Sequence, residues 1–129
     1  MTQEDKELLL KDLCARLPYG VKIQIPELFR PSVQITETLV SIDNGHINDS
    51  GMKIEFVKPY LRIMSSMIEE ERKEFNSSCV IIYDEIKGKT ILYTIETIDW
   101  LNSHYFDYRG LIPKGLAIEV TKENNPYKE

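Results

Sequence analysis

The sequence has little cysteine and lacks any long apolar run. Cys14 and Cys79 are its only two cysteines among 129 residues, and they stand far apart. This pattern favours two reduced, buried thiols over a disulfide or a reactive thiol. No apolar stretch approaches the roughly 18 residues that a membrane-spanning helix needs. The N-terminal run MTQEDKELLLKDL is acidic and amphipathic, unlike a signal peptide. We therefore expect a cytoplasmic protein with no membrane partner.

Several functional signatures are also missing. There is no run of Lys and Arg, and the formal net charge is −5, which disfavours nucleic acid as a partner because affinity for phosphates rests largely on basic side chains. The sequence holds no glycine-rich phosphate loop, no Gly-x-Ser-x-Gly turn and no paired-cysteine motif. His46, His104, Cys14 and Cys79 lack metal-ligand spacing. We predict neither a metal nor a cofactor.

The composition is that of an ordinary globular protein, with 42% hydrophobic and 29% charged residues. Its length predicts a single domain over residues 1–129, with a polar, frayed tail from about residue 122. The hydrophobic pattern predicts the α+β class. We expect an antiparallel-rich sheet with an N-terminal helix, a middle helix and a short helix near residues 98–106.

Capping signals and apolar spacing locate the first two helices. Thr2 and Asp5 resemble a capping box that opens a helix over about residues 3–16. Its predicted apolar face consists of Leu9, Leu10, Leu13, Cys14 and Leu17. Ser65 or Ser66 introduces the middle helix, which has acids in its first turns. Its predicted inner face consists of Met67, Ile68, Glu71 and Phe75.

Strand signals recur along the chain. Runs rich in alternating or β-branched residues occupy positions 21–25, 33–42, 52–57, 79–83 and 90–95 and predict one antiparallel-rich sheet. The turn signal Asp43-Asn44-Gly45 leaves two alternatives: His46-Ile47 opens a return strand with a bulge or second turn at 49–51, or residues 43–51 form one loop. We favour a three-stranded meander that includes residues 21–25. A second hairpin is expected around Lys87-Gly88-Lys89.

The stretch from Thr97 to Leu116 contains the only tryptophan. Thr97 or Asp99 can cap a two-turn helix, which must be held by the packing of its aromatic face because it is too short to be stable alone. Gly110 suits a left-handed residue beyond the helix end, and residues 116–120 alternate as a closing strand. The candidate binding residues all lie here: Trp100, His104, Tyr105, Asp107, Tyr108 and Arg109.

These residues allow two hypotheses. In an enzyme, His104 would act as a general base oriented by Asp107, and Arg109 would bind an anionic substrate. In a structural role, His104 would stabilise a helix C-terminus, and Asp107 and Arg109 would fix the loop by hydrogen bonds. Asp107 would then also be able to form a structural ion pair with Arg62 and Arg109. A gathering of Tyr19, Tyr60, Tyr105 and Tyr108 into an aromatic recognition surface is a further alternative.

Three blocks carry a resemblance to known sequences. The phrases DLCARLPYGV (12–21), KPYLRIMSSM (58–67) and WLNSHYFDYRGLIPKGLA (100–117) resemble a family of short uncharacterised proteins of anaerobic gut bacteria and their phages. The resemblance implies a cytosolic or phage-encoded accessory protein and supplies no site residue. We predict a small non-enzymatic protein-binding or adaptor module with a protein partner. The alternative is a small enzyme that uses His104, Asp107 and Arg109 on an anionic substrate.

Overall fold

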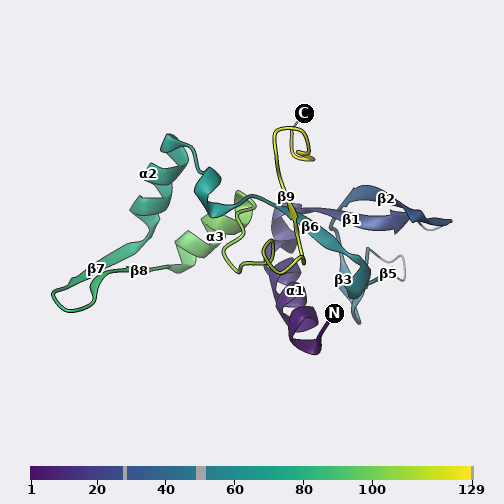
Figure 1. The fold of residues 1–129 in the computed structure, drawn as a ribbon, viewed down its shortest axis with the longest axis horizontal. Helices are drawn as coiled ribbons and strands as arrows, with labels where there is room; N and C mark the ends of the chain where they lie inside the picture. Colours follow the sequence, from purple (N-terminus) through teal and green to yellow (C-terminus); the bar gives the residue numbers. More distant parts are fainter. Residues whose placement is uncertain (28, 49–51, 129) are drawn as a thin grey trace.

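The computed structural model describes residues 1–27, 29–48 and 52–128, and within them it has the predicted α+β class (Figure 1). The helices are α1 (Gln3–Arg16), α2 (Glu69–Ser78) and α3 (Ile95–Ser103), with short 3-10 helices η1 (Leu17–Tyr19), η2 (Ile54–Phe56) and η3 (Met64–Ser66). The strands are β1 (Lys22–Glu27), β2 (Arg30–Thr38), β3 (Ile42–Asp43), β4 (His46–Ile47), β5 (Met52–Lys53), β6 (Lys58–Leu61), β7 (Val80–Asp84), β8 (Gly88–Leu92) and β9 (Ile118–Glu119).

Helix α1 begins and ends where the sequence predicts. The Thr2 hydroxyl accepts a hydrogen bond from the Asp5 N–H at 3.0 Å, and the Asp5 carboxylate accepts one from the Thr2 N–H at 3.4 Å, so the capping box is present. The buried side chains of the helix are Leu9, Asp12, Leu13 and Arg16. The predicted apolar face is therefore wrong in part, because Leu10 and Cys14 are exposed. Two of the buried side chains of the helix, Asp12 and Arg16, are charged instead.

The cysteines also differ from the prediction. Both are free, but Cys14 is exposed and Cys79 is only partly buried. The expectation that both thiols are buried is wrong. Cys14 follows the buried Leu13 by one position, and a step of one residue along an α-helix moves a side chain to a different face.

The main sheet has the strand order β2-β1-β6-β9. β1 pairs with β2 as an antiparallel hairpin, and Ile23 and Ile25 of β1 are buried, as their alternation predicts. β6 pairs with β9 in parallel, with Tyr60 opposite Ile118. This pair joins the middle of the chain to its closing strand, which the sequence had predicted over residues 116–120.

A second, smaller sheet consists of β3, β4 and β5. Asn44 and Gly45 both have positive φ, 51° and 77°, as a two-residue hairpin turn requires. His46 and Ile47 therefore form a return strand, the first of the two alternatives, whereas the bulge or turn predicted at 49–51 lies outside the described residues. The favoured meander is wrong, because β1 has β2 and β6 as neighbours. Half of the predicted strand at 52–57 forms η2 instead, and Ile54 of η2 and the following Val57 lie in the core.

The two later helices begin at other residues than predicted. α2 starts after Ile68, whose side chain is 59% exposed, so its assignment to the inner face is wrong. α3 starts earlier than expected, because the Thr94 hydroxyl accepts a hydrogen bond from the Thr97 N–H at 3.1 Å. Thr94 is thus the cap, and neither Thr97 nor Asp99 is.

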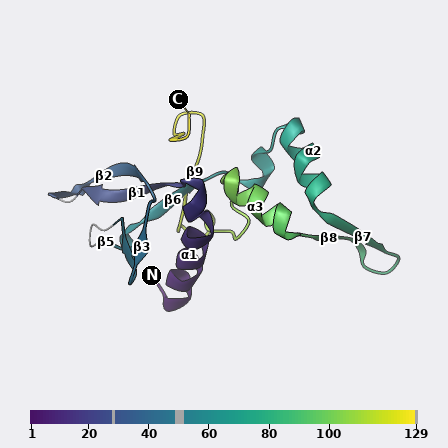
Figure 2. The same ribbon diagram turned by 180° about the vertical axis from the view of Figure 1, so that it is seen from behind.

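The buried apolar side chains form two clusters. The larger cluster lies among α1, β1, β6 and the small sheet. The smaller one contains Met67, Phe75, Leu101 and Phe106 and packs α2 against α3. Both ribbon views place α2 and α3 on one side of α1 and the main sheet on the other (Figures 1 and 2).

The strands β7 and β8 form the predicted second hairpin, but they form a separate two-stranded sheet. The described strands thus fall into three sheets and not one. The hairpin projects from the ends of α2 and α3, away from the rest of the protein (Figure 1). We call residues 80–92, the two strands with their turn, the arm. None of the described helices has the length and apolar character needed to cross a membrane.

Candidate functional site

Residues 105–107 connect two of the three sequence blocks through the backbone. The Arg62 N–H donates to the Tyr105 carbonyl at 2.8 Å, and the Asp107 N–H donates to the Arg62 carbonyl at 2.8 Å. These bonds form a parallel bridge between Arg62 and Phe106. The Phe106 side chain is fully buried at this crossing. The segment after α3 is therefore held like a short strand.

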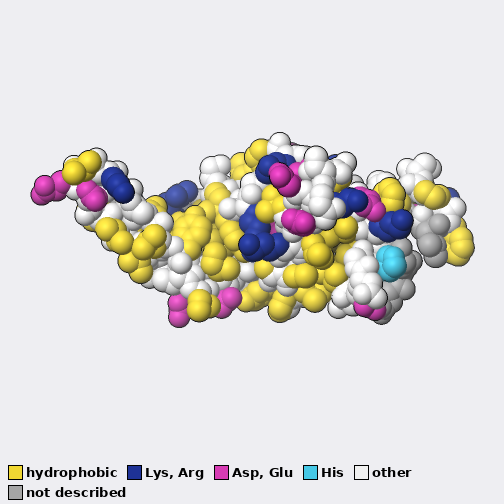
Figure 3. Space-filling model, turned by 90° about the horizontal axis from the view of Figure 1, so that it is seen from below, with side chains coloured by type: hydrophobic (Ala, Val, Ile, Leu, Met, Phe, Trp, Pro, Cys, Tyr) yellow, Lys and Arg dark blue, Asp and Glu magenta, His cyan; other side chains and the backbone are white. Residues whose placement is uncertain are grey.

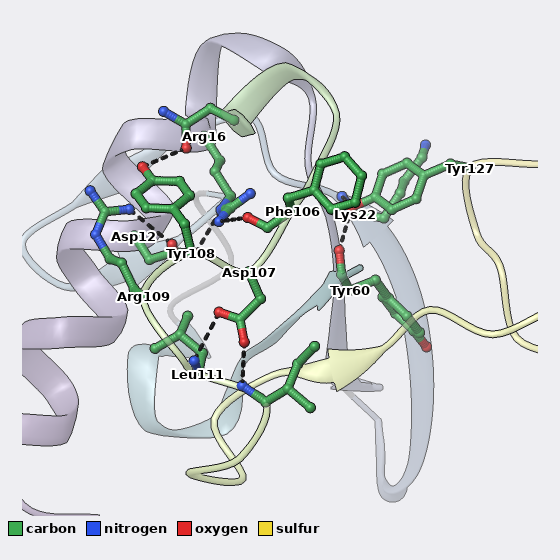
Figure 4. A network of polar contacts seen from close by, with 12 residues as sticks. Asp12, Arg16, Lys22, Tyr60, Phe106, Asp107, Tyr108, Arg109, Leu111 and Tyr127 are labelled. Atoms are coloured by element: carbon green, nitrogen blue, oxygen red, sulfur yellow. Dashed lines mark hydrogen bonds and ion pairs between the residues drawn. The ribbon is translucent and has the colours of Figure 1, made fainter. Parts of the chain in front are cut away.

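Beside this bridge lies a buried cluster of charges (Figure 4). Asp12 and Arg16 of α1 have no exposed side-chain surface, and the Arg16 Nε lies 2.8 Å from one Asp12 oxygen. The other Asp12 oxygen accepts a hydrogen bond from Arg109 at 2.9 Å. Arg16 also donates from Nη2 to the Phe106 carbonyl at 2.6 Å. One carboxylate thus stabilises two guanidinium groups, and Arg109 is tied to α1.

Tyr108 lies between these two arginines. The Arg16 guanidinium is 5.2 Å and the Arg109 guanidinium 4.6 Å from the centre of its ring, within the range of cation–π attraction. Its hydroxyl donates to the Asn102 side chain at 2.8 Å. The ring is partly buried, and both its face and its hydroxyl contact other parts of the same chain.

Asp107 holds the turn that follows. Its carboxylate accepts hydrogen bonds from the N–H groups of Leu111 at 2.8 Å and Ile112 at 2.9 Å. The hypothesis that Asp107 fixes the loop is confirmed. The proposed ion pair of Asp107 with Arg62 or Arg109 is wrong, because Arg62 binds Glu71 and Arg109 binds Asp12. A carboxylate engaged by two backbone N–H groups needs no cation partner.

The Arg62 side chain connects the bridge between Arg62 and Phe106 to α2. Its two terminal nitrogens each donate to a Glu71 oxygen at 2.7 Å, and its guanidinium lies 4.2 Å from the centre of the Phe106 ring. The Glu71 carboxylate also accepts a hydrogen bond from the Ile68 N–H at 3.0 Å. The hydrogen bonds from Arg62 lower the pKa of Glu71, burial opposes this in part, and the Ile68 N–H lowers it further.

This shift predicts a dependence of stability on pH. Because the folded-state pKa of Glu71 lies below its ordinary value of 4.5, the stabilisation is present above that pH. It is lost as the pH falls through the lowered pKa. We expect Glu71→Gln to cost about 1 kcal/mol near neutral pH and to make urea unfolding less sensitive to acid. The exposed Glu70→Gln is the matched control; equal acid sensitivity in both variants would contradict the assignment.

Trp100 and His104 lie one above the other at the end of α3. Their rings stack at 4.2 Å between centres, and the His104 Nδ1 lies 2.9 Å from the Trp100 carbonyl oxygen. Trp100 donates from Nε1 to Glu74 of α2 at 2.8 Å and also stacks on Phe106. His104 is the C-terminal cap of the helix, as its structural hypothesis predicted. Trp100 is partly buried and bridges the two helices.

Tyr105 ends α3 in a conformation that usually belongs to glycine. Its φ is +63°, and the N–H groups of Tyr105 and Phe106 donate to the carbonyls of Asn102 and Leu101, the Schellman pattern. Its hydroxyl donates to the Tyr19 carbonyl at 2.6 Å, and its ring stacks on Tyr127 at 3.9 Å. These contacts hold a backbone geometry that is otherwise unfavourable for tyrosine.

The C-terminal segment is not frayed at Tyr127. Its hydroxyl accepts a hydrogen bond from the Lys22 N–H at 2.9 Å and donates to the Tyr60 carbonyl at 2.7 Å (Figure 4). Burial raises the pKa of Tyr127. The Tyr127 hydroxyl therefore connects the C-terminal segment to both β1 and β6.

The candidate residues are thus neighbours in sequence but serve different contacts. His104 contacts α3, Asp107 contacts the following turn, and Arg109 contacts α1. Among the described residues, no three His, Cys, Asp or Glu side chains gather as metal ligands would. The arrangement connects α1, α2, α3 and the main sheet; it does not aim a base and a cation at a common point.

The arm presents a different kind of surface, which the sequence reasoning did not single out. Between residues 80 and 95, the exposed large apolar side chains are Val80, Ile82, Tyr83, Ile86, Ile91, Leu92, Tyr93 and Ile95. At the tip, Ile86 is 94% exposed and Tyr83 is 78% exposed. In the space-filling view, apolar side chains gather along the extension that leaves the body of the protein (Figure 3).

Both faces of the arm are apolar. In the register of the hairpin, Ile81 lies opposite Ile91 on one face, and Val80 lies opposite Leu92 on the other. An ordinary surface hairpin alternates, with an apolar face packed on a core and a polar face in water. Strands that are apolar on both faces are typical of a sheet that is covered on both sides. The run Val80-Ile81-Ile82-Tyr83 carried this signal in the sequence.

Comparison of the chain with models of protein families, with curated proteins and with solved structures found no match. The contacts and exposed surfaces of the chain itself are therefore what point to a function.

Proposed function

We propose that this chain is a small non-enzymatic protein-binding module and that the arm is its binding element. The observation that carries the proposal is the exposure of apolar side chains on both faces and at the tip of a projecting hairpin. Exposed apolar patches of this kind on monomeric proteins mark interaction sites.

The energetics of a two-stranded hairpin support this proposal. A hairpin of two strands is marginally stable in water unless its faces pack against something. Within the described residues no third strand pairs with β7 or β8. A protein partner that covers the arm would bury its apolar surface and satisfy the free backbone groups at its edges. Aromatic anchors such as Tyr83 are typical of binding hot spots.

The geometry favours binding over the alternative enzyme. Catalysis by His104, Asp107 and Arg109 would require their polar atoms to converge on a substrate. Their observed partners are instead the Trp100 carbonyl, two backbone N–H groups and Asp12. Each group stabilises a different part of the fold.

The proposal is tested by comparing how much of a binding protein two variants of the chain isolate from a lysate. The tagged chain is used to isolate binding proteins, identified by mass spectrometry, from lysates of the cell that makes it. We expect Tyr83→Ser/Ile86→Ser to reduce the yield of a specific partner at least about tenfold, because it removes two exposed anchors. Val40→Ser, which changes a side chain 67% exposed in the link between β2 and β3, should retain the partner. Equal yields from both variants would contradict the role of the arm.

A further inference from the structure

The arm has two edges that differ in chemistry. The outer edge of β8 carries Lys89, and Lys87 lies in the turn before it. Lysines on an edge strand oppose pairing with another strand. β7 carries no charge and no proline from Val80 to Tyr83. The β7 edge is therefore the one open to a further strand.

We propose that a second copy of this chain occupies that edge, with β7 of one copy pairing antiparallel to β7 of the other about a two-fold axis at Ile82. This inference rests on the proposed function and names the partner. The axis at the middle of β7 places Ile82 opposite its own copy, and Ile81 opposite Tyr83. The two arms then form one four-stranded sheet, with a Lys-bearing β8 at each outer edge.

The exposed apolar area of the arm approaches the size of a standard interface. The exposed fractions of its six exposed large apolar side chains, Val80, Ile82, Tyr83, Ile86, Ile91 and Leu92, taken with about 200 Å² for a large apolar side chain, give on the order of 700 Å², of which the pairing covers the part beside the axis and at the tip. A standard specific interface buries about 800 Å² on each partner. A patch of this size on one hairpin suits pairing with an equal patch, as a two-fold interface requires.

The charges of the arm also suit self-pairing. Asp84 and Glu85 are balanced by Lys87 and Lys89, so the arm has no net charge although the chain carries −5. Two arms can therefore approach without the repulsion that a charged strand would meet. In the proposed register Val80, and not a second acid, lies opposite Asp84.

The register also gives the tip of the arm a place to bind. An axis at Ile82 brings Ile86 of one copy level with Ser78 of the other. At this point a shallow hollow of about 660 Å³ lies between α2 and α3. Its lining consists of Lys73, Glu74, Ser77, Ser78, Glu96 and Trp100. The most exposed apolar side chain of the arm thus meets a hollow that contains an indole ring.

Disulfide trapping at matched positions tests the pairing. In the full chain with Cys14→Ser and Cys79→Ala, one cysteine is introduced at Ile82 or at Thr90. These two residues lie opposite each other in the hairpin, on the same face and at the same distance from the tip, but on different edges. Directly opposed residues of antiparallel strands have Cα atoms about 4.5–5.5 Å apart, within the ~4.4–6.8 Å that a disulfide spans.

We expect Ile82→Cys to form a disulfide-linked dimer on mild oxidation and Thr90→Cys to remain largely monomeric. The unmodified chain should show twice its mass of 15.0 kDa in light scattering at high concentration. Ile82→Lys should weaken this association at least about tenfold, because each copy contributes one lysine to the axis. Thr90→Lys should weaken it less.

Two results would overturn the inference: a chain that stays monomeric at every concentration, or trapping through Thr90→Cys in place of Ile82→Cys. Circular dichroism shows whether each variant folds. If a variant does not fold, the mass of the unmodified chain in light scattering decides whether the chain forms a dimer. A monomeric chain whose arm still captures another protein refutes self-pairing and leaves the binding function standing. A monomeric chain whose arm captures nothing refutes both.

Discussion

Replacing Asp12 with alanine is expected to lower the free energy of unfolding by about 3–5 kcal/mol, because the change leaves a buried positive charge without its partner. Asp12 and Arg16 have fully buried side chains. Asp12 is also the ion-pair partner of Arg109. The Phe106 carbonyl would still accept from Arg16, but a single carbonyl does not neutralise a guanidinium. Urea unfolding near neutral pH measures the effect.

The matched control replaces both members of the pair. Asp12→Ala/Arg16→Met removes the carboxylate and the buried charge together, and the methionine side chain refills much of the space. A buried ion pair is often replaced by apolar residues at little cost, so this double variant should be more stable than Asp12→Ala alone. If the double variant is the less stable of the two, Arg16 contributes mainly through other contacts, and the interpretation of the cluster is wrong.

Replacing Phe106 with alanine is expected to cost a similar amount, about 3–5 kcal/mol, through lost contacts and the cavity that remains. Phe106 is fully buried between α2 and α3, and its ring contacts both Arg62 and Trp100. The backbone hydrogen bonds between this segment and Arg62 do not depend on the Phe106 side chain. The loss of stability therefore measures the packing of the Phe106 ring. The same urea experiment measures it.

Phe29→Ala is the matched control, because it makes the same chemical change at a side chain that is 87% exposed. Its effect should lie within about 0.5 kcal/mol of zero. Trp100→Ala should cost less than Phe106→Ala, since Trp100 is only partly buried. If Trp100→Ala lowers the free energy of unfolding more than Phe106→Ala does, the hydrogen bond from Trp100 to Glu74, and not the buried Phe106 ring, holds α3 in place.

The features that depend on neighbouring residues could be predicted from the sequence. The capping box of Thr2 and Asp5 acts across three positions, and the Asn44-Gly45 turn requires only the positive φ that these two residues tolerate. The span of α1 and the hairpin of β7 and β8 followed from such local signals. These elements are determined by short-range sterics and hydrogen bonds, which remain the same in most tertiary surroundings.

The candidate site was predicted only in part. That Asp107 fixes its loop and that His104 ends a helix follow from the preferences of these side chains near free backbone groups. Their neighbour Arg109 binds Asp12, 97 positions away. The sequence offered several carboxylates for each arginine. Only the packing of α1 against the segment after α3 selects one of them.

The sequence by itself therefore determined the α+β class, the span of α1, the Asn44-Gly45 turn and the strand pair at 80–92. The tertiary structure decided which face of α1 is buried, that β9 lies parallel to β6, and that the arm is exposed. The apolar pattern of β7 is equally compatible with a central strand and with an exposed one. Which of these it becomes depends on whether another part of the protein covers it, and burial is a property of the whole packed chain.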